Sequence, residues 1–161
     1  MNQNKIIIYY SYTGHTKMIA NMIQESLGCD VLELKPKVPY STDYQTVVDE
    51  EENAGDDNFR EIEPIGIDLS KYDEVILGFP VWWYIPASPV RTFLKEYDLS
   101  GKTIIPYATN AGWLGHSFNE IAKLCPASQI KNELNIVFDT DYKKSKLKTS
   151  EEEIANWIKN L

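Results

Sequence analysis

Short apolar runs alternate along the chain with stretches of helical periodicity. Each apolar run is rich in β-branched residues and has the length of a strand buried on both faces. The predicted strands cover residues 5–10, 30–34, 74–79, 103–108 and 134–138. In the segments between them, apolar residues recur every three or four positions, as in helices with one buried face. These predicted helices lie at residues 18–27, 89–97, 118–124 and 151–161. The alternation predicts an α/β fold, a three-layer α/β/α sandwich around a parallel sheet.

Residues with special backbone preferences mark the ends of these elements. Gly28 stands where the first helix needs a C-terminal cap. The pair Ser88–Pro89 predicts the start of a helix, and Ser150 with Glu153 predicts a capping box. Pro106 lies inside the fourth predicted strand and predicts a bulge there. Neither a repeat nor a long linker divides the sequence, so we expect a single domain over residues 1–161.

The composition is that of an ordinary globular domain, with 43% hydrophobic and 25% charged residues. Two cysteines, Cys29 and Cys125, are too few for a disulfide framework, a redox pair or a zinc cluster. The apolar runs are far shorter than the ~20 residues of a membrane span. The first residues do not have the pattern of a secretory leader. We therefore expect a cytoplasmic protein without a membrane partner and without a metal.

The whole net charge of −8 lies between residues 43 and 63. Acidic residues fill this segment, with Arg60 as its one base: Asp43, Asp49, Glu50, Glu51, Glu52, Asp56, Asp57, Glu61 and Glu63. The rest of the chain is neutral, which argues against a nucleic-acid partner. Val47 and Val48 indicate a short helix within the segment. Two interpretations stay open, a solvated face and a docking patch for partner proteins with basic surfaces.

The carboxyl ends of the predicted strands define where a ligand would bind. Ligands of open α/β sheets lie outside these ends, near the point where the strand order reverses. This rule selects three loops, at residues 11–16, 80–84 and 109–117. We expect the three loops to meet at one edge of the sheet.

The first loop has the composition of a phosphate-binding turn. Ser11, Thr13 and Thr16 supply hydroxyls, Gly14 lets the backbone approach, and a helix N-terminus follows. The loop lacks the glycine spacing of nucleoside-triphosphate and dinucleotide sites. It also contains no cysteine nucleophile, so a phosphate would be held there and not transferred. The alternative is that Thr13 or Thr16 only caps the helix.

The other two loops are rich in aromatic residues. Trp82, Trp83 and Tyr84 follow the third strand, and Trp113 lies between Gly112 and Gly115. We expect one of the paired tryptophans to pack against the body of the protein. Three successive aromatics cannot all point inward, and stacking on a flat ligand would add roughly 0.5–1.5 kcal/mol beyond buried area. With the first loop, they predict a site for an aromatic mononucleotide.

These motifs resemble the flavodoxin family over most of the chain. The matching segments are the Ser-x-Thr-Gly-x-Thr loop at 11–16, the Gly-x-Pro-Val-Trp-Trp segment at 78–83 and the loop that starts at Thr109. The resemblance implies a five-stranded parallel sheet in the order 2-1-3-4-5 and one non-covalent FMN. The residues it assigns to the phosphate are Ser11, Tyr12, Thr13, Gly14, His15 and Thr16. The residues it assigns to the flavin ring are Pro80, Val81, Trp82, Trp83, Tyr84, Thr109, Asn110, Ala111, Gly112, Trp113, Leu114 and Gly115.

The resemblance implies an electron carrier with no catalytic residue of its own. It would be a monomeric, low-potential protein that shuttles single electrons between a reductase and acceptor enzymes. A low potential is expected because nearby negative charge disfavours a reduced, anionic flavin. The alternative is an FMN-dependent NAD(P)H:quinone or azo reductase. Such an enzyme needs room for nicotinamide over the flavin, and the bulk of Trp82, Trp83, Tyr84 and Trp113 argues against that room.

Overall fold

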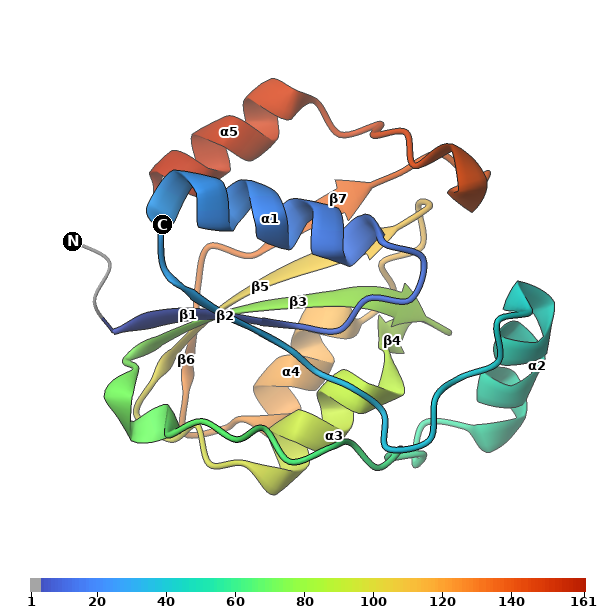
Figure 1. The fold of residues 1–161 in the computed structure, drawn as a ribbon, viewed down its shortest axis with the longest axis horizontal. Helices are drawn as coiled ribbons and strands as arrows, with labels where there is room; N and C mark the ends of the chain where they lie inside the picture. Colours follow the sequence, from blue (N-terminus) through green and yellow to red (C-terminus); the bar gives the residue numbers. More distant parts are fainter. Residues whose placement is uncertain (1–3) are drawn as a thin grey trace.

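A parallel β-sheet runs through the middle of the molecule and carries helices on both faces (Figure 1). The computed structural model describes residues 4–161. The parallel strands are β1 (Lys5–Tyr9), β2 (Asp30–Glu33), β3 (Glu74–Trp82), β5 (Thr103–Asn110), β6 (Gln129–Ile130) and β7 (Leu134–Val137). Their order is β2-β1-β3-β5-β6, and β7 also pairs with β5. Since β6 and β7 share the last position, the predicted order 2-1-3-4-5 is confirmed.

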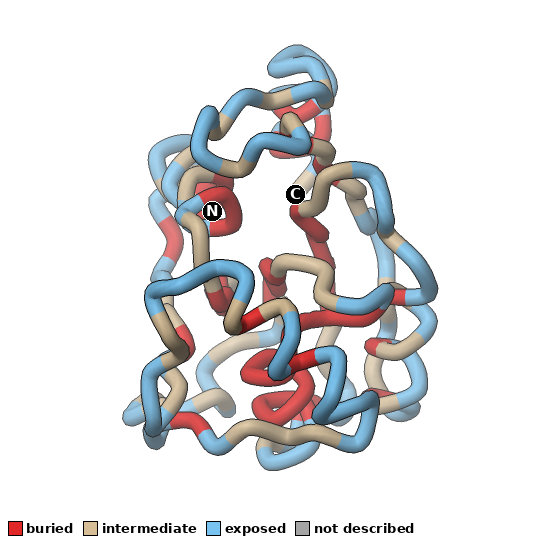
Figure 2. Tube along the Cα trace, turned by 90° about the vertical axis from the view of Figure 1, so that its right-hand side faces the viewer, coloured by how far each residue is buried: buried red, intermediate tan, exposed pale blue. Residues whose placement is uncertain are grey.

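The helices complete the predicted sandwich. On one face, α1 (His15–Leu27) and α5 (Glu151–Lys159) bury Ile19, Ile154 and Trp157 in the same apolar cluster as Ile7 of β1. On the other face, α3 (Ser88–Glu96) and α4 (Ser117–Leu124) pack with Ile6 and Ile8. Successive residues of β1 thus point to opposite layers, as the pleat requires. Figure 2 shows the buried residues in the strands and on the inner sides of the helices. Within residues 4–161, no helix has the length and apolar character needed to cross a membrane.

Two of the three predicted caps are confirmed, and the third is wrong. Gly28 adopts a left-handed conformation and its N–H donates to the carbonyl of Gln24. Ser150 Oγ accepts from the N–H of Glu153 at the start of α5. The helix start predicted at Ser88–Pro89 is confirmed, because α3 begins at Ser88, but the N-cap is Ala87 and the predicted capping role of Ser88 is wrong. Its hydroxyl accepts from Arg60 N–H and donates to the carbonyl of Asn58, so it fastens the 58–60 segment to α3.

The bulge predicted at Pro106 is absent, because the register of β5 against β3 is continuous through Leu77 and Pro106. The carbonyl of Ile104 accepts from Lys131 N–H, and that of Asn110 accepts from Phe138 N–H. Even-numbered residues of β5 therefore point their backbone groups toward β6 and β7. The missing N–H of Pro106 faces the gap between these two short strands, where no hydrogen bond is lost.

The acidic segment contains the predicted helix, α2 (Tyr44–Ala54), which Asp43 caps by accepting from Thr46 N–H. It stands beyond the carboxyl ends of the strands, apart from the two helical layers (teal in Figure 1). The short strand β4 (Ile85–Pro86) and two short 3-10 turns, η1 (Leu69–Lys71) and η2 (Tyr142–Lys144), complete the elements of the described residues. The segments that lead into and out of α2 place it beside the predicted ligand loops.

Candidate functional site

The turn between β1 and α1 presents a row of unused backbone donors. Gly14 is the N-cap of α1 and has a φ of 98°, a conformation that favours glycine. Among the described residues, no acceptor is found for the N–H groups of residues 11–16. Lys17 N–H bonds Ser11 Oγ, and Met18 N–H begins the helical ladder. Six successive free donors at a helix N-terminus form a cradle that fits a phosphate.

Hydrogen bonds from the sheet hold the cradle in place. Thr16 is buried, and its Oγ1 shares a hydrogen bond of 2.7 Å with Thr109 Oγ1. The hydroxyl of Tyr107 donates to the carbonyl of Thr16 over 3.1 Å. The Tyr107 ring crosses Gly78, where an added Cβ would lie 2.2 Å from the ring. Glycine is thus required at position 78 so that Tyr107 can reach α1.

His15 is fixed against the loop that follows β7. Its ring stacks on Phe138 with a centroid distance of 4.1 Å and an interplanar angle of 6°. Its Nε2–H donates to the carbonyl of Tyr142 over 3.0 Å. Burial lowers the pKa of His15 below 6.5, although the Tyr142 carbonyl opposes this shift. The imidazole is therefore predominantly neutral at pH 7, and it positions the loop after β7 against the cradle.

The segment predicted as an exposed loop after the third strand is instead a hairpin. β3 continues to Trp82, and β4 (Ile85–Pro86) returns antiparallel to it. Trp83 and Tyr84 form the turn, with φ values of 52° and 72°. Positive φ at both turn residues matches the twist of a two-residue hairpin, although glycine and asparagine adopt it more easily. The strand continues past residue 79 because β3 still pairs with β5 as far as Pro80 and with β4 beyond it.

The paired tryptophans take different positions, as predicted. Trp82 packs edge-on against Tyr10, Tyr12 and Tyr40, at centroid distances of 5.7, 5.9 and 5.1 Å. Trp83 is 39% exposed, and its Nε1–H donates to the carbonyl of Val48 on α2. The hairpin therefore ties α2 to the sheet through one indole and packs the other inward.

A pocket opens where the three loops meet. Its lining includes ten of the residues predicted from the sequence: Tyr12, Thr13, His15, Pro80, Val81, Trp82, Thr109, Asn110, Ala111 and Trp113. The volume is about 190 Å³. Trp113 is 61% exposed at the rim of the pocket. The structure thus brings the phosphate cradle and both aromatic loops to one edge of the sheet, as the sequence predicted.

Other predicted residues lie outside this pocket. Ser11, Gly14 and Thr16 belong to the frame of the cradle, and Trp83 faces α2. Tyr84 and Gly115 touch each other on the outer side of the hairpin, and His116 N–H donates to the carbonyl of Tyr84. Gly112 and Leu114 also lie outside the lining, and Leu114 packs against the α3–α4 core. The ligand assignments of these residues stay predictions.

Residues that sequence reasoning missed complete the lining: Tyr44, Phe138, Asp139, Thr140 and Tyr142. Four of them follow β7, so the rule on carboxyl strand ends, applied to the fifth strand, selects them. Tyr44 carries no such signal, because it reaches the pocket from the first turn of α2. Its ring stacks on Tyr142 at 4.1 Å and 8°, which joins α2 to η2 across the pocket.

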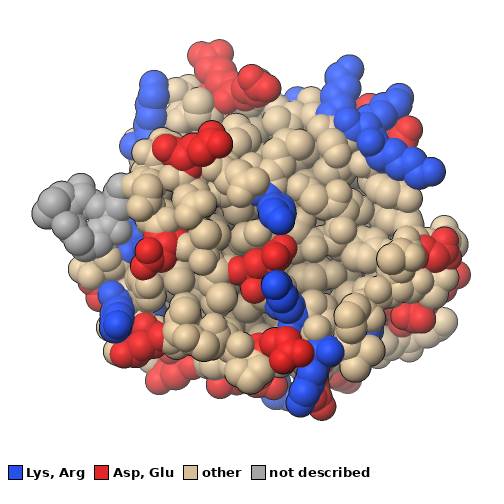
Figure 3. Space-filling model, in the orientation of Figure 1, with Lys and Arg blue, Asp and Glu red and all other residues tan. Residues whose placement is uncertain are grey.

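The lining of the pocket carries one carboxylate, Asp139, and several lysines lie just outside the lining. Neither lysine nor arginine belongs to its lining within the described chain. The backbone N–H of Asp141 lowers the pKa of Asp139, so that this carboxylate is ionised at neutral pH. On the face drawn in Figure 3, basic side chains gather at the upper right, in the region of η2, and acidic and basic side chains elsewhere lie among uncharged ones. Among the described residues, the lining itself therefore offers backbone dipoles and aromatic faces, and positive charge comes only from the lysines near Asp139.

The fold and this pocket together define a doubly wound α/β protein with a mononucleotide-type site at the carboxyl ends of its strands. A flavodoxin family model matches residues 4–161, and the chain belongs to that family. No curated protein sequence matches it.

Solved structures agree with this family. A flavoprotein from Lactobacillus acidophilus, in complex with FMN, is 25% identical, with a TM-score of 0.70 over 83% of this chain and 92% of the other. A putative flavoprotein from Bacteroides eggerthii is 25% identical, with a TM-score of 0.74 over 99% and 98% of the two chains. A putative flavoprotein from Bacteroides uniformis is 23% identical and has a TM-score of 0.77 over 97% of each chain, which supports the fold.

Proposed function

We propose that this protein binds one FMN in the pocket between the cradle and the aromatic loops and carries single electrons at low potential. The cradle carries this proposal, because six backbone N–H groups that have no acceptor within residues 4–161 open beside an aromatic pocket. The FMN-bound relative from Lactobacillus acidophilus supports the choice of ligand. Bound FMN would supply the redox chemistry, since its ring accepts and releases electrons.

The residues of the chain would bind and orient this group. The N–H groups of residues 11–16 would hold the phosphate, and the hydroxyl of Thr13 would add a side-chain donor. Pro80, Val81 and Trp82 would form one wall for the ring, and the loop from Thr109 to Trp113 the other. The ionised Asp139 and the lack of lining cations among the described residues would disfavour added negative charge. This electrostatic setting supports a low potential.

Titration of the FMN-free protein with FMN tests the proposal, with quenching of flavin fluorescence as the readout. Riboflavin, which lacks the phosphate, is the matched control ligand. If the cradle holds the phosphate through several charge-assisted hydrogen bonds, riboflavin should bind at least about 100-fold more weakly. Equal affinities for the two ligands, or no quenching with FMN, would refute the proposal.

Turnover by the purified protein separates a carrier from a reductase. A carrier should show slow NAD(P)H oxidation with a quinone, and rapid electron delivery only when a separate reductase is added. Rapid turnover with the protein alone would favour the alternative, an FMN-dependent quinone or azo reductase.

The acidic helix α2 is the surface where we expect redox partner proteins to dock. Asp49, Glu50 and Glu52 are exposed on this helix, which borders the pocket through Tyr44. We propose that the protein acts as a monomer and that redox partners dock basic surfaces here. The rate of electron transfer should then fall as salt rises. A rate that is insensitive to salt would contradict docking at α2.

A further inference from the structure

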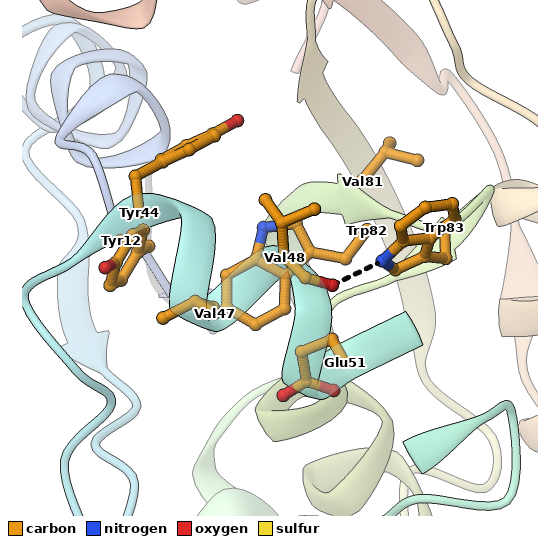
Figure 4. Close-up of a pocket in the computed structure, with 8 residues that line it drawn as sticks. All are labelled: Tyr12, Tyr44, Val47, Val48, Glu51, Val81, Trp82 and Trp83. Carbon is orange, nitrogen blue, oxygen red and sulfur yellow. Dashed lines mark hydrogen bonds between the residues drawn. The ribbon is translucent and has the colours of Figure 1, made fainter. Parts of the chain in front are cut away.

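A second hollow lies under α2, between this helix and the β3–β4 hairpin (Figure 4). Its volume is about 150 Å³, and it is lined by Tyr12, Tyr44, Val47, Val48, Glu51, Val81, Trp82 and Trp83. Tyr12, Tyr44, Val81 and Trp82 also line the pocket assigned above to FMN. The two spaces are therefore neighbours that share a wall, and Val47, Val48, Glu51 and Trp83 line the hollow alone.

The walls of the hollow are apolar and mostly aromatic. Val47 and Val48 come from α2, and the indoles of Trp82 and Trp83 come from the hairpin (Figure 4). The hydrogen bond of 3.0 Å from Trp83 Nε1–H to the carbonyl of Val48 sets the spacing between helix and hairpin. Trp82 is held from behind by the edge-on rings of Tyr10 and Tyr40. These contacts keep the hollow open and give it flat faces suited to a ring.

One carboxylate belongs to this apolar lining. Glu51 is 8% exposed, and its Oε2 accepts from Asn58 Nδ2–H over 2.8 Å. For its Oε1, no hydrogen-bond donor is found in residues 4–161. The buried Arg91 is committed elsewhere, because it donates to the carbonyls of Pro86 and Asp56. Within the described residues, this second oxygen is therefore open to a hydrogen bond from a donor that a ligand brings.

A buried hydroxyl near Glu51 is also without a partner. The hydroxyl of Tyr40 is shielded from solvent and makes no hydrogen bond with the described part of the chain. Burial, followed by the side-chain interaction with Glu51, raises the pKa of Tyr40 well above its ordinary value, so the phenol stays protonated. Tyr40 is not one of the residues that line the hollow, so its hydroxyl lies behind the lining, next to Glu51. Glu51 is thus the carboxylate of the lining that a donor of a ligand would reach.

We propose that the hollow binds a single-ring aromatic molecule that carries a hydroxyl or amino group. The ring would lie between the valines of α2 and the indoles of the hairpin, and its O–H or N–H would donate to Glu51. A cavity of about this volume accommodates one benzene ring, which sets the size limit. The site does not depend on the phosphate cradle, so it exists with or without FMN.

Fluorine NMR with 4-fluorophenol as the probe tests this proposal on the full chain, both FMN-free and FMN-loaded. The probe should bind both forms with similar affinity. Fluorobenzene has the same ring without the donor, and it should bind about tenfold more weakly because it cannot bond Glu51. This pair of ligands tests the site in the unaltered protein, without any risk of misfolding.

A cavity-filling variant locates the bound probe. Val48→Phe fills the hollow while its backbone carbonyl still accepts from Trp83, and it should weaken 4-fluorophenol binding at least about tenfold. Val38→Phe is the matched control, because Val38 is 67% exposed and lines neither space. This control should bind the probe as the parent does. Urea unfolding of both variants checks that each is folded.

Three results would overturn the proposal. They are no binding of 4-fluorophenol at millimolar concentration, binding that Val48→Phe leaves unchanged, and displacement of the probe by FMN. Displacement would show that the hollow is part of the flavin pocket. The FMN titration described above is independent of these measurements. A protein that binds the probe and ignores FMN would refute the proposed function alone.

Discussion

The phosphate cradle and the aromatic rim meet at one edge of the sheet, yet they are built in different ways. The cradle is locked into the core by Thr16, by Tyr107 and by the stack of His15 on Phe138. In the aromatic rim, the β3–β4 hairpin is paired and packed inward, but α2 and the side chains of Trp83 and Trp113 are held mainly by side-chain contacts at the surface or stand exposed. Cradle donors are therefore fixed before a ligand arrives, whereas rim aromatics are able to adjust to it.

Because of this difference, changes in the cradle should affect mainly the stability of the fold, and changes in the rim should affect mainly the affinity for a ligand. A change that disturbs the cradle also disturbs the packing of α1 on the sheet, so the free energy of unfolding should fall. A change in the rim removes contacts that form mainly with a ligand, so affinity should fall while stability stays nearly constant. The following predictions test this division, beginning with the largest expected effect.

Gly78→Ala should cause the largest loss of stability. The new Cβ would lie 2.2 Å from the buried ring of Tyr107, which has little room to move, so we expect a loss of about 3 kcal/mol in the free energy of unfolding. Urea unfolding measures this change. Gly112→Ala at the rim is the control, because nothing lies within 4 Å of its added Cβ and only the backbone strain of its positive φ remains, so its loss should be smaller. Equal losses for the two variants would show that the rim is as rigid as the cradle.

Trp113→Ala should weaken FMN binding by about tenfold, since one aromatic stack contributes roughly 0.5–1.5 kcal/mol. The free energy of unfolding should change by less than about 0.5 kcal/mol, because the side chain is largely exposed. Fluorescence titration and urea unfolding give the two values. Tyr84→Ala removes another exposed aromatic, one that lines neither pocket, and should leave FMN affinity near that of the parent. A larger loss of FMN affinity in Tyr84→Ala than in Trp113→Ala would mean that the flavin ring lies on the side of the hairpin that carries Tyr84.

The stack of Tyr44 on Tyr142 should slow the exchange of FMN. Tyr44→Ala and Tyr142→Ala each break this bridge across the pocket, so we expect FMN to dissociate about three- to tenfold faster in either variant. Stopped-flow displacement by excess riboflavin, or by apoprotein, gives the rate. The double variant should add little to either single change, because both remove the same contact. Additive effects would mean that each tyrosine contacts the ligand separately.

His15→Gln should produce the smallest effect, a change in the pH dependence of stability. Because burial lowers the pKa of His15 in the folded protein, the unfolded chain binds a proton more readily. The contribution of neutral His15 to the free energy of unfolding is fully present above pH 6.5. It is lost as the pH falls from there through the pKa of His15 in the folded protein. Urea unfolding between about pH 7.5 and about pH 5.5 should therefore show a shallower decline in the variant. His116→Gln, at an exposed histidine, is the control. An unchanged decline in His15→Gln would assign the acid sensitivity to other groups.

The order of strands and the place of the site could be predicted from the sequence because both depend on local patterns. Apolar runs such as Ile6–Ile8 and the glycine at position 14 carry their structural meaning within a few residues. The hairpin turn at Trp83 and Tyr84 could not be predicted, because neither residue favours a positive φ and only pairing with β4 imposes it. Ser88 has the sequence signature of a cap, but a distant segment at Arg60 uses its hydroxyl. Tyr44 reaches the pocket only through the tertiary placement of α2.

The broken fifth strand has a consequence for self-association. Long, unpaired strands at the borders of a sheet recruit strands from other molecules. Here one border is divided between β6 and β7, and neither offers more than four residues. At the opposite border, the 61–63 segment bonds the chain just beyond β2, with Glu63 N–H donating to Lys35 and Lys37 N–H to Glu61. Because both edges of the sheet are short or covered, few backbone groups are available to pair with a strand of another molecule. We therefore expect concentrated solutions of the protein to resist fibril growth.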